Sequence, residues 1–317
     1  MTADFHPTRK GGLRPNNPTK PRLRLTRGLV RQIPEHPIAS DMFGNVSLAM
    51  DLNDQFGTCV PTGFDNLRRM VTVLLTGIEQ DASKEDIVTW YRTQNPGFDP
   101  DLSADDPDQQ DGGMVIQDFL SYLTKQGLIV GFAEIDPADD ELLKAANYLA
   151  MGPYSGVELT NHQVSEQFDE GTWDEVGGYA VGGHCIPSGA YSGAELAEED
   201  CATWQQRIHM TAEFLDRRRS EAWAVIFPDH LTHPGFRKSV DLAAFATAWT
   251  EITGRPFPVT VDPDPEPTPT PEPPVPGGVG WFQVDPGLVA PLGRAAAHHH
   301  RTPTEELNHA LRRYLHR

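Results

Sequence analysis

The chain has 317 residues, of which 38% are hydrophobic and 22% charged, an ordinary composition for a globular protein with one large domain or two small ones. No apolar stretch approaches the roughly 20 residues that span a bilayer, and the N-terminus has no apolar core of a signal peptide. The composition therefore argues against a membrane-spanning protein and predicts one that stays in a cytoplasm.

The formal charge of -19 is unevenly distributed along the chain. The first 31 residues carry eight cationic side chains against a single acid, Asp4, and the remainder sums to -26. Phosphate contacts supply most of the affinity for nucleic acids, so the acidic remainder is a poor candidate for binding them, and only the basic segment could do so. The simpler alternative is that this segment is solvated or lies on the acidic body. The cations are Arg9, Lys10, Arg14, Lys20, Arg22, Arg24, Arg27 and Arg31.

Changes in composition predict four segments. Residues 1–40 form a basic extended arm, because Pro, Gly, Asn, Arg and Lys dominate them without apolar periodicity. Residues 41–258 form the folded body. Residues 259–278 are a Pro-rich linker that is too stiff and polar to form a core. Residues 279–317 are a tail with a short C-terminal amphipathic helix, whose apolar stripe must dock on another surface.

Helical periodicity dominates the first half of the body. Apolar residues recur at three- and four-residue spacing over residues 60–78, 83–91, 114–126 and 139–151. Residues 95–113 are dense in Asp, Pro and Gly, which predicts a long surface loop.

Strand-like runs dominate the second half. They cover residues 128–135, 154–159, 182–191, 201–204 and 222–227. Two further helices are predicted at residues 210–220 and 241–253. Helices that come first and strands that come later favour an α+β fold over alternating βαβ units.

The chain has only three cysteines, Cys59, Cys185 and Cys201, which argues against a disulfide scaffold and leaves at least one free thiol. Cys59 follows the polar turn N-D-Q-F-G-T and precedes the helix predicted from residue 60. The N-terminus of a helix lowers the pKa of a thiol through the helix dipole and the free N–H groups, which favours a nucleophile. A small buried side chain on the helix face is the alternative, since free cysteine is among the most buried residue types.

His184 lies in G-G-H-C-I-P-S-G-A-Y, after a Gly pair at the start of a strand of small residues. An imidazole at such a place can face a cleft, although a single histidine is more often structural. Cys185 points to the opposite side of the strand and is the weaker nucleophile candidate. Zinc binding by His184 and Cys185 is disfavoured, because adjacent strand residues diverge and no C-x-x-C motif accompanies them.

No cofactor and no metal site are predicted. The run His298–His300 could hold a transition metal, but three consecutive histidines in a tail are more often incidental. The acidic loop lacks the Gly-centred spacing of a calcium loop, and no phosphate-cradling Gly motif occurs.

Together these stretches resemble the papain-like cysteine peptidases over roughly residues 40–255. Cys59 opens a long helix as the family's nucleophile does. E-L-L-K-A-A-N-Y-L-A-M-G-P-Y-S-G-V-E-L resembles the family's helix, Gly-Pro turn and strand, and F-D-E-G-T-W its short aromatic loop. G-G-H-C-I-P matches the His-bearing strand, and C-A-T-W-Q-Q lies where the family has Asn-Ser-Trp-Gly. With M-T-A-E-F-L-D and E-A-W-A-V-I-F-P-D, the pattern is similar to papain-like proteins of actinobacteriophages.

The resemblance implies a helical half, opened by the nucleophile helix, packed on an antiparallel β-sheet half with a cleft between them. It implies Cys59 as nucleophile and His184 as its base. Asn53, six residues before the cysteine, would donate to the oxyanion in place of the family's usual Gln.

The resemblance also places Gly112, Gly113 and Trp173 near the rim of the cleft, and it shows a departure at the residue that orients the imidazole. Alignment on the Trp of C-A-T-W puts Ala202 at the position of the family's orienting Asn. Thr203 beside it is expected to face the other way in a strand.

The implied function is a thiol hydrolase, a cysteine peptidase or amidase that cleaves peptide or isopeptide bonds of a peptide or protein substrate. The alternative is a catalytically impaired papain-like module, a phage virion or assembly protein whose basic arm and C-terminal helix bind other subunits. Ala202 and the Pro-rich linker favour this alternative and leave enzymatic activity open. A lytic cell-wall peptidase is a third possibility, though the tail has no evident wall-binding domain. These readings place the protein in the cytoplasm of a bacterial host or in the virion.

Overall fold

The computed structural model describes residues 7–26, 29, 40–192 and 198–260. The chain divides into two compact units, Met1–Pro263 and Asp264–Arg317, and every element described below belongs to the first. The predicted linker from residue 261 onward, the tail helix and His298–His300 lie outside the described residues.

The helices predicted in the first half of the body form within two residues of their expected ends. They are α1 (Cys59–Thr76), α2 (Lys84–Arg92), α3 (Ile116–Lys125) and α4 (Asp140–Leu149). A reciprocal pair of hydrogen bonds sets the start of α2, because Ser83 Oγ accepts from the Asp86 N–H and the Asp86 carboxylate accepts from the Ser83 N–H. No α-helix or β-strand interrupts residues 95–113, as expected for a loop.

Eight strands form one sheet in the order β2-β8-β3-β5-β6-β7-β4, with β1 paired to β5. Only the pairing of β4 with β7 is parallel among these strands. The strands are β1 (Ser40–Asp41), β2 (Gly131–Ile135), β3 (Tyr154–Thr160), β4 (Thr172–Trp173), β5 (Ala180–Ser192), β6 (Glu198–Thr203), β7 (Gln206–Met210) and β8 (Arg219–Ile226). The α+β prediction is confirmed.

The sequence pattern missed β7, because the turn before it carries no Gly, Asn or Asp. Trp204 and Gln205 connect β6 to β7 directly, with positive φ angles of 42° and 63°. Such two-residue hairpin turns usually place residues without a Cβ penalty at these positions.

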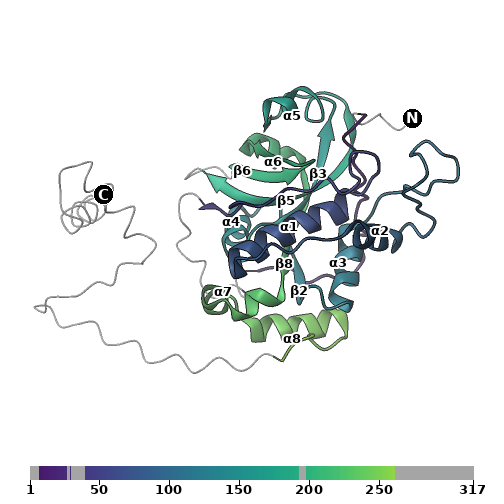
Figure 1. The fold of residues 1–317 in the computed structure, drawn as a ribbon. Coiled ribbons are helices and arrows are strands. Elements are labelled where there is room, and N and C mark those ends of the chain that lie inside the picture. Colours follow the sequence, from purple (N-terminus) through teal and green to yellow (C-terminus); the bar gives the residue numbers. More distant parts are fainter. Residues whose placement is uncertain (1–6, 27–28, 30–39, 193–197, 261–317) are drawn as a thin grey trace, which may run out of the picture. The chain divides into compact units, whose positions relative to one another are not determined.

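The remaining helices lie at two ends of the unit. In Figure 1, α5 and α6 lie at the end with β6, and α8 lies at the opposite end. The helices are α5 (Glu166–Glu170), α6 (Ala212–Arg218), the 3₁₀-helix η1 (Pro228–Thr232), α7 (Pro234–Ser239) and α8 (Leu242–Thr253). None of the helices in the described ranges combines the length and apolar character that a bilayer span requires.

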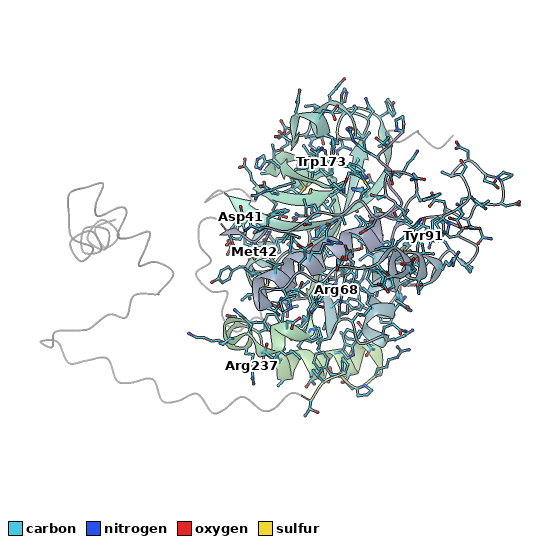
Figure 2. All side chains as sticks on the ribbon, in the orientation of Figure 1. Asp41, Met42, Arg68, Tyr91, Trp173 and Arg237 are labelled. Carbon is cyan, nitrogen blue, oxygen red and sulfur yellow. The ribbon has the colours of Figure 1, made fainter. Side chains whose placement is uncertain are left out.

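Two apolar cores divide the unit into a helical half and a sheet half. The larger core joins α1 to α4 with β2, β8 and the helices after β8, and it contains Tyr91. The smaller core is formed by β3 to β7 together with α5 and α6, and it contains Trp173 of β4 (Figure 2). Strand β5 contributes Cys185 to the larger core and Ile186 to the smaller one. Because side chains alternate along a strand, β5 forms part of the boundary between the two halves.

Gly152 makes the turn from α4 into β3, and its conformation tests this packing. It has φ of 124°, and a Cβ there would lie 1.7 Å from the Ser188 carbonyl oxygen in β5.

Gly152→Ala should therefore lower the free energy of unfolding by about 2–4 kcal/mol. Gly77→Ala is the matched control, because Gly77 has φ of 76° but open space around it, and it should cost only about 1 kcal/mol. Equal losses in urea unfolding would contradict the close contact of this turn with β5.

Candidate active site

Cys59 is the first residue of α1, and hydrogen bonds order the turn before it. The hydroxyls of Thr58 and Thr62 both donate to the Asp51 carbonyl oxygen, at 3.0 and 3.3 Å. Pro61 lies in the first helical turn, where the N–H group that it lacks would have no partner within the helix. The thiol therefore lies at the positive end of the helix dipole.

The Cys59 thiol is almost completely buried, with a relative exposure of 1%. Burial raises the pKa of the Cys59 thiol to about 12, and the negative charge of Asp111 adds to the rise. Hydrogen bonding from the backbone of Cys185 and Gly12 acts in the opposite direction and lowers the pKa, since it favours the thiolate. Burial dominates, so the thiol is protonated at neutral pH in this state.

Asp111 ties the turn before Cys59 to the end of the acidic loop. Both of its carboxylate oxygens accept the Gly57 N–H, at 2.9 and 3.0 Å, and it also accepts a short hydrogen bond from the Tyr91 hydroxyl. The Tyr91 oxygen in turn accepts the Gly113 N–H at 2.9 Å. One carboxylate thus fixes the backbone two residues before Cys59 relative to the Gly112-Gly113 pair.

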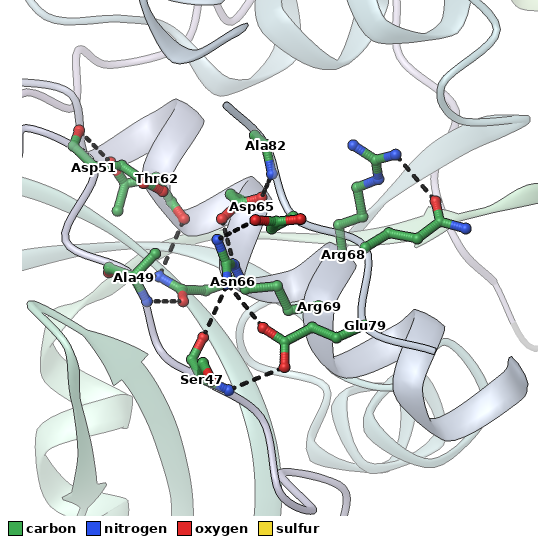
Figure 3. A network of polar contacts seen from close by, with 12 residues as sticks. Ser47, Ala49, Asp51, Thr62, Asp65, Asn66, Arg68, Arg69, Glu79 and Ala82 are labelled. Carbon is green, nitrogen blue, oxygen red and sulfur yellow. Dashed lines mark hydrogen bonds and ion pairs between the residues drawn. The ribbon is translucent and has the colours of Figure 1, made fainter. Parts of the chain in front are cut away.

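A buried polar network fixes the chain before this turn to the middle of α1 (Figure 3). The Asn66 amide exchanges two hydrogen bonds with the backbone of Ala49, at 2.8 and 3.1 Å. Asp65 accepts from Arg69 at 2.5 Å and from the Ala82 N–H at 2.6 Å. Burial, together with the nearby Asp65 carboxyl, raises the pKa of Asp51 to about 7. Asp51 itself has φ of 44°, so the network holds a strained residue at the start of the turn.

Asn53 lies inside this turn with its side-chain amide buried. Its Nδ2 donates to the Phe56 carbonyl oxygen at 3.0 Å and to the Lys10 carbonyl oxygen at 2.9 Å. The amide that the sequence singles out as an oxyanion donor is therefore bound to a carbonyl oxygen of the N-terminal arm.

His184 projects from β5 toward the smaller core. It pairs with Val157 of β3, on the face of Ile186, whereas Cys185 faces α1. The imidazole stacks on Trp204, with ring centroids 4.2 Å apart and planes 22° apart. Complete burial lowers the pKa of His184 to about 3, so the ring is neutral.

Thr203 binds the imidazole, and the expectation that it faces away is wrong. Its hydroxyl lies 2.7 Å from His184 Nε2. Ala202 points to the other core, because β6 presents Thr203 to the same face of the sheet as His184. The Thr203 hydroxyl thus contacts the imidazole, which the family's Asn would orient from the position that Ala202 occupies here. Strand alternation alone could have revealed Thr203 once the face of His184 was known.

The three site residues predicted from the sequence converge on the same stretch of backbone. Asn53 Nδ2 and the Trp204 indole N–H both donate to the Lys10 carbonyl oxygen, at 2.9 and 3.3 Å, and Trp204 carries the His184 ring. Hydrogen bonding from the backbone of Cys185, the residue after His184, lowers the pKa of the Cys59 thiol. His184 Nδ1 is buried and has no hydrogen-bond partner, so no hydrogen bond joins the thiol to this nitrogen in this state.

Of three comparisons with known proteins, only the comparison with solved structures finds matches, and it supports the fold. No protein-family model and no curated protein matches the chain. Among solved structures, it is similar to xylellain, a cysteine protease from Xylella fastidiosa, with a TM-score of 0.53 and 12% identity over 69% of this chain and 97% of that one. The fold is papain-like.

Two further structures are similar at lower scores. Procathepsin B S9 from Trypanosoma congolense has a TM-score of 0.48 and 9% identity, over 70% of this chain and 87% of that one. Procathepsin L 3 of the Tenebrio molitor larval midgut has a TM-score of 0.47 and 9% identity, over 70% of this chain and 77% of that one. At these identities, the likeness concerns the fold alone.

The N-terminal arm occupies the space between the two halves of the papain-like fold. Leu13 pairs with Met114 in parallel and with Gly183 in antiparallel orientation. The Gly12 and Leu13 N–H groups both donate to the Gly183 carbonyl oxygen at 3.2 Å, and the Met114 N–H donates to the Gly12 carbonyl oxygen at 2.7 Å. The arm therefore has backbone hydrogen bonds to both halves beside Cys59.

Gly12 passes so close to Gly57, in the turn before Cys59, that no side chain fits at position 12. A Cβ at Gly12 would lie 2.0 Å from the Gly57 carbonyl oxygen, and one at Gly113 would lie 2.1 Å from the Gly12 carbonyl oxygen. Trp173, which the resemblance places near the cleft rim, is instead fully buried in the smaller core, with its ring edge toward His184.

Thr203 provides a direct test of how the imidazole is held. Thr203→Val keeps the shape but leaves His184 Nε2 buried without a partner, which should lower the free energy of unfolding by about 1–3 kcal/mol. Thr203→Ser retains the hydroxyl and should lower the free energy of unfolding by less than Thr203→Val does. If urea unfolding gives the same stability for the Val variant and the wild type, Thr203 does not hold the ring.

Glu221 joins the arm to the sheet, and its ionisation should make the stability of the folded state depend on pH. It accepts hydrogen bonds from the Trp223 indole N–H at 2.6 Å and from Asn16, while burial raises the pKa of Glu221 to about 7. The folded state holds this proton up to about pH 7 and the unfolded chain loses it near pH 4.5, so the contribution to stability falls as the pH rises through that window.

In the wild type, the titration of Glu221 should lower the free energy of unfolding by roughly 3 kcal/mol between pH 4.5 and pH 7.5, the magnitude that this pKa difference implies. Glu221→Gln should abolish this pH-dependent decrease. Urea unfolding of both proteins across this range measures it. An unchanged pH dependence in the variant would show that Glu221 is ionised in the folded protein.

Proposed function

We propose that the chain is a papain-like thiol hydrolase, a cysteine peptidase or amidase, that is latent while its N-terminal arm fills the cleft. One observation carries the proposal. Cys59 opens α1, and His184 on the neighbouring strand β5 has its Nε2 held by Thr203 and its Nδ1 without a hydrogen-bond partner. A nucleophile at a helix N-terminus with an oriented imidazole is the arrangement that acyl transfer by a thiol needs.

In the proposed reaction, Cys59 Sγ attacks the carbonyl carbon of the substrate while His184 Nδ1 takes the thiol proton. The resulting oxyanion is bound by the Cys59 backbone N–H and Asn53 Nδ2. Collapse breaks the carbon–nitrogen bond, and His184 returns the proton to the leaving amine. Water then hydrolyses the thioester with His184 as base. Thr203 holds Nε2 throughout and leaves Nδ1 as the nitrogen that carries the proton.

Burial explains why the arm makes the site latent. The pKa of the thiol is raised to about 12 and that of the imidazole is lowered to about 3, both by burial, so the resting pair is a neutral thiol and a neutral imidazole. Departure of the arm gives water access to both groups. This lowers the first pKa and raises the second, which brings the pair closer to a reactive thiolate and imidazolium.

Gly12→Leu in the full chain tests latency, because the new side chain clashes with the Gly57 carbonyl oxygen and should expel the arm from the cleft. Alkylation of Cys59 by iodoacetamide, measured by peptide mapping, should become at least about tenfold faster, while Cys185 and Cys201 stay unreactive. Thr19→Leu, at an exposed position of the same arm, is the matched control and should behave as the wild type. Equal alkylation of all three cysteines in the Gly12 variant would count against Cys59 as the nucleophile.

Hydrolysis itself requires a second comparison. In the Gly12→Leu background, Cys59→Ala should abolish cleavage of a casein substrate, and His184→Gln should reduce it by about 100-fold or more. Cleavage that persists after Cys59→Ala would refute the hydrolase.

A second candidate function is a non-catalytic papain-like module of a phage virion or of its assembly, in the bacterial host cell. The extensive contacts of the arm and the neutral, fully buried thiol favour this candidate. This candidate comes from the resemblance of the motifs after His184 to those of papain-like proteins of actinobacteriophages. Its test is whether Cys59→Ala particles form and infect normally with the protein attached to purified particles. Loss of infectivity with intact attachment would favour the hydrolase.

A further inference from the structure

The chemistry of the arm reveals what kind of polypeptide fits the cleft. Residues 7–26 contain six Lys or Arg and no Asp or Glu. At one end, the Arg9 guanidinium contacts the Asp169 carboxylate at 2.5 Å and lies 4.0 Å from the centre of the Phe168 ring. It also donates to the Val164 carbonyl oxygen at 2.7 Å. The sheet half therefore has a binding place for a cation that combines charge with an aromatic face.

The helical half binds the other end of the arm through acids as well. Glu134, on β2, contacts the guanidinium groups of Arg22 at 2.8 Å and Arg24 at 3.1 Å, and its side chain is only 14% exposed. Lys20 forms an ion pair with Asp118 on α3. Backbone hydrogen bonds of 2.7 Å from Leu25 to Glu134 and from Glu134 to Leu23 add the arm to the edge of the sheet. Carboxylates on both halves thus follow the path of an extended chain.

The middle of the cleft limits the size of the side chains that a bound segment can carry. Gly12 leaves no room for a Cβ against Gly57, whereas the Leu13 side chain lies over Gly156, where an added Cβ would meet it at 2.5 Å. A chain that follows this path needs glycine beside Cys59 and tolerates an apolar side chain next to it.

We propose that, after the arm leaves, the same cleft recognises an extended cationic polypeptide segment with glycine at the nucleophile, and that this is the substrate class of the site. The status of the segment as a substrate depends on the proposed hydrolase function, but its recognition does not. Departure of the arm leaves Asp118, Glu134 and Asp169 without their arm cations, on a body whose sequence after residue 31 sums to -26. A neutral or acidic segment would leave these carboxylates unpaired, and an acidic one would also be repelled.

The test measures binding without cleavage. The receptor is the full chain carrying Gly12→Leu and Cys59→Ala, and the probe is a fluorescent peptide with the sequence of residues 8–25, followed by anisotropy. The peptide should bind this receptor, and it should bind at least about tenfold more weakly to the Cys59→Ala chain whose arm is intact, because that arm competes. A peptide in which every Lys and Arg is replaced by Glu should bind at least about tenfold more weakly, and salt should weaken the binding of the cationic peptide.

Receptor variants assign the recognition to the named carboxylates. Asp118→Asn, Glu134→Gln and Asp169→Asn together should weaken the binding of the peptide by roughly tenfold. Asp105→Asn, an exposed acid of the loop before Gly112, is the control and should leave binding unchanged. Equal affinity for the cationic and charge-reversed peptides, or no effect of the triple change, would overturn the inference. Failure of the Gly12→Leu chain to cleave casein would refute the hydrolase and leave the recognition intact, because a bound peptide with the sequence of the arm reproduces the latent state.

Discussion

The state of the candidate site depends on the passage of Gly12 between Gly57 and Gly113. At this place, backbone approaches backbone with no space for a side chain, which lets the arm reach the floor of the cleft. The carbonyl oxygen of Lys10 then accepts hydrogen bonds from Asn53 and Trp204, and the N–H of Gly12 donates to the Gly183 carbonyl oxygen. A segment with bulkier residues here would remain farther from the site and leave the thiol open to water.

Two opposing effects act on the thiol, and their magnitudes decide its state. The helix N-terminus favours the thiolate by up to about 2 kcal/mol. Burial raises the pKa of the Cys59 thiol from 9.0 to about 12, which corresponds to about 4 kcal/mol in favour of the neutral form. Burial is therefore the larger effect. The helix, the Asp111 contact to Gly57 and the Thr203 contact to His184 belong to the body, whereas the proposed latency attributes the burial of the thiol to the arm.

Much of the fold follows from local patterns in the sequence. The apolar periodicity of α1 to α4, the Ser83 capping signal and the order of helices and strands sufficed to predict an α+β fold, and the papain-like resemblance gave its two halves. Strand β7 was missed because Trp204 and Gln205 form its turn without the residues that usually mark one.

The site was harder to predict than the fold, because it depends on contacts between distant segments. Asn53 is separated from Lys10 by 43 residues, and His184 from Thr203 by 19. The position of Thr203 required knowledge of which face of β5 carries His184, which periodicity within one strand does not give. The charge of the arm is consistent with a place on the acidic body, but its path past Cys59 depends on the fit of Gly12, which is visible only in three dimensions.

Amide hydrogen exchange of the full wild-type chain tests the position of the arm most directly. The N–H groups of Gly12, Leu13 and Arg14 donate to Gly183 and Met114 in the cleft. Their exchange should be at least about 100-fold slower than in an unstructured peptide of the same sequence. Exchange at the unstructured rate would contradict an arm bound over Cys59, and with it the account of a latent papain-like site.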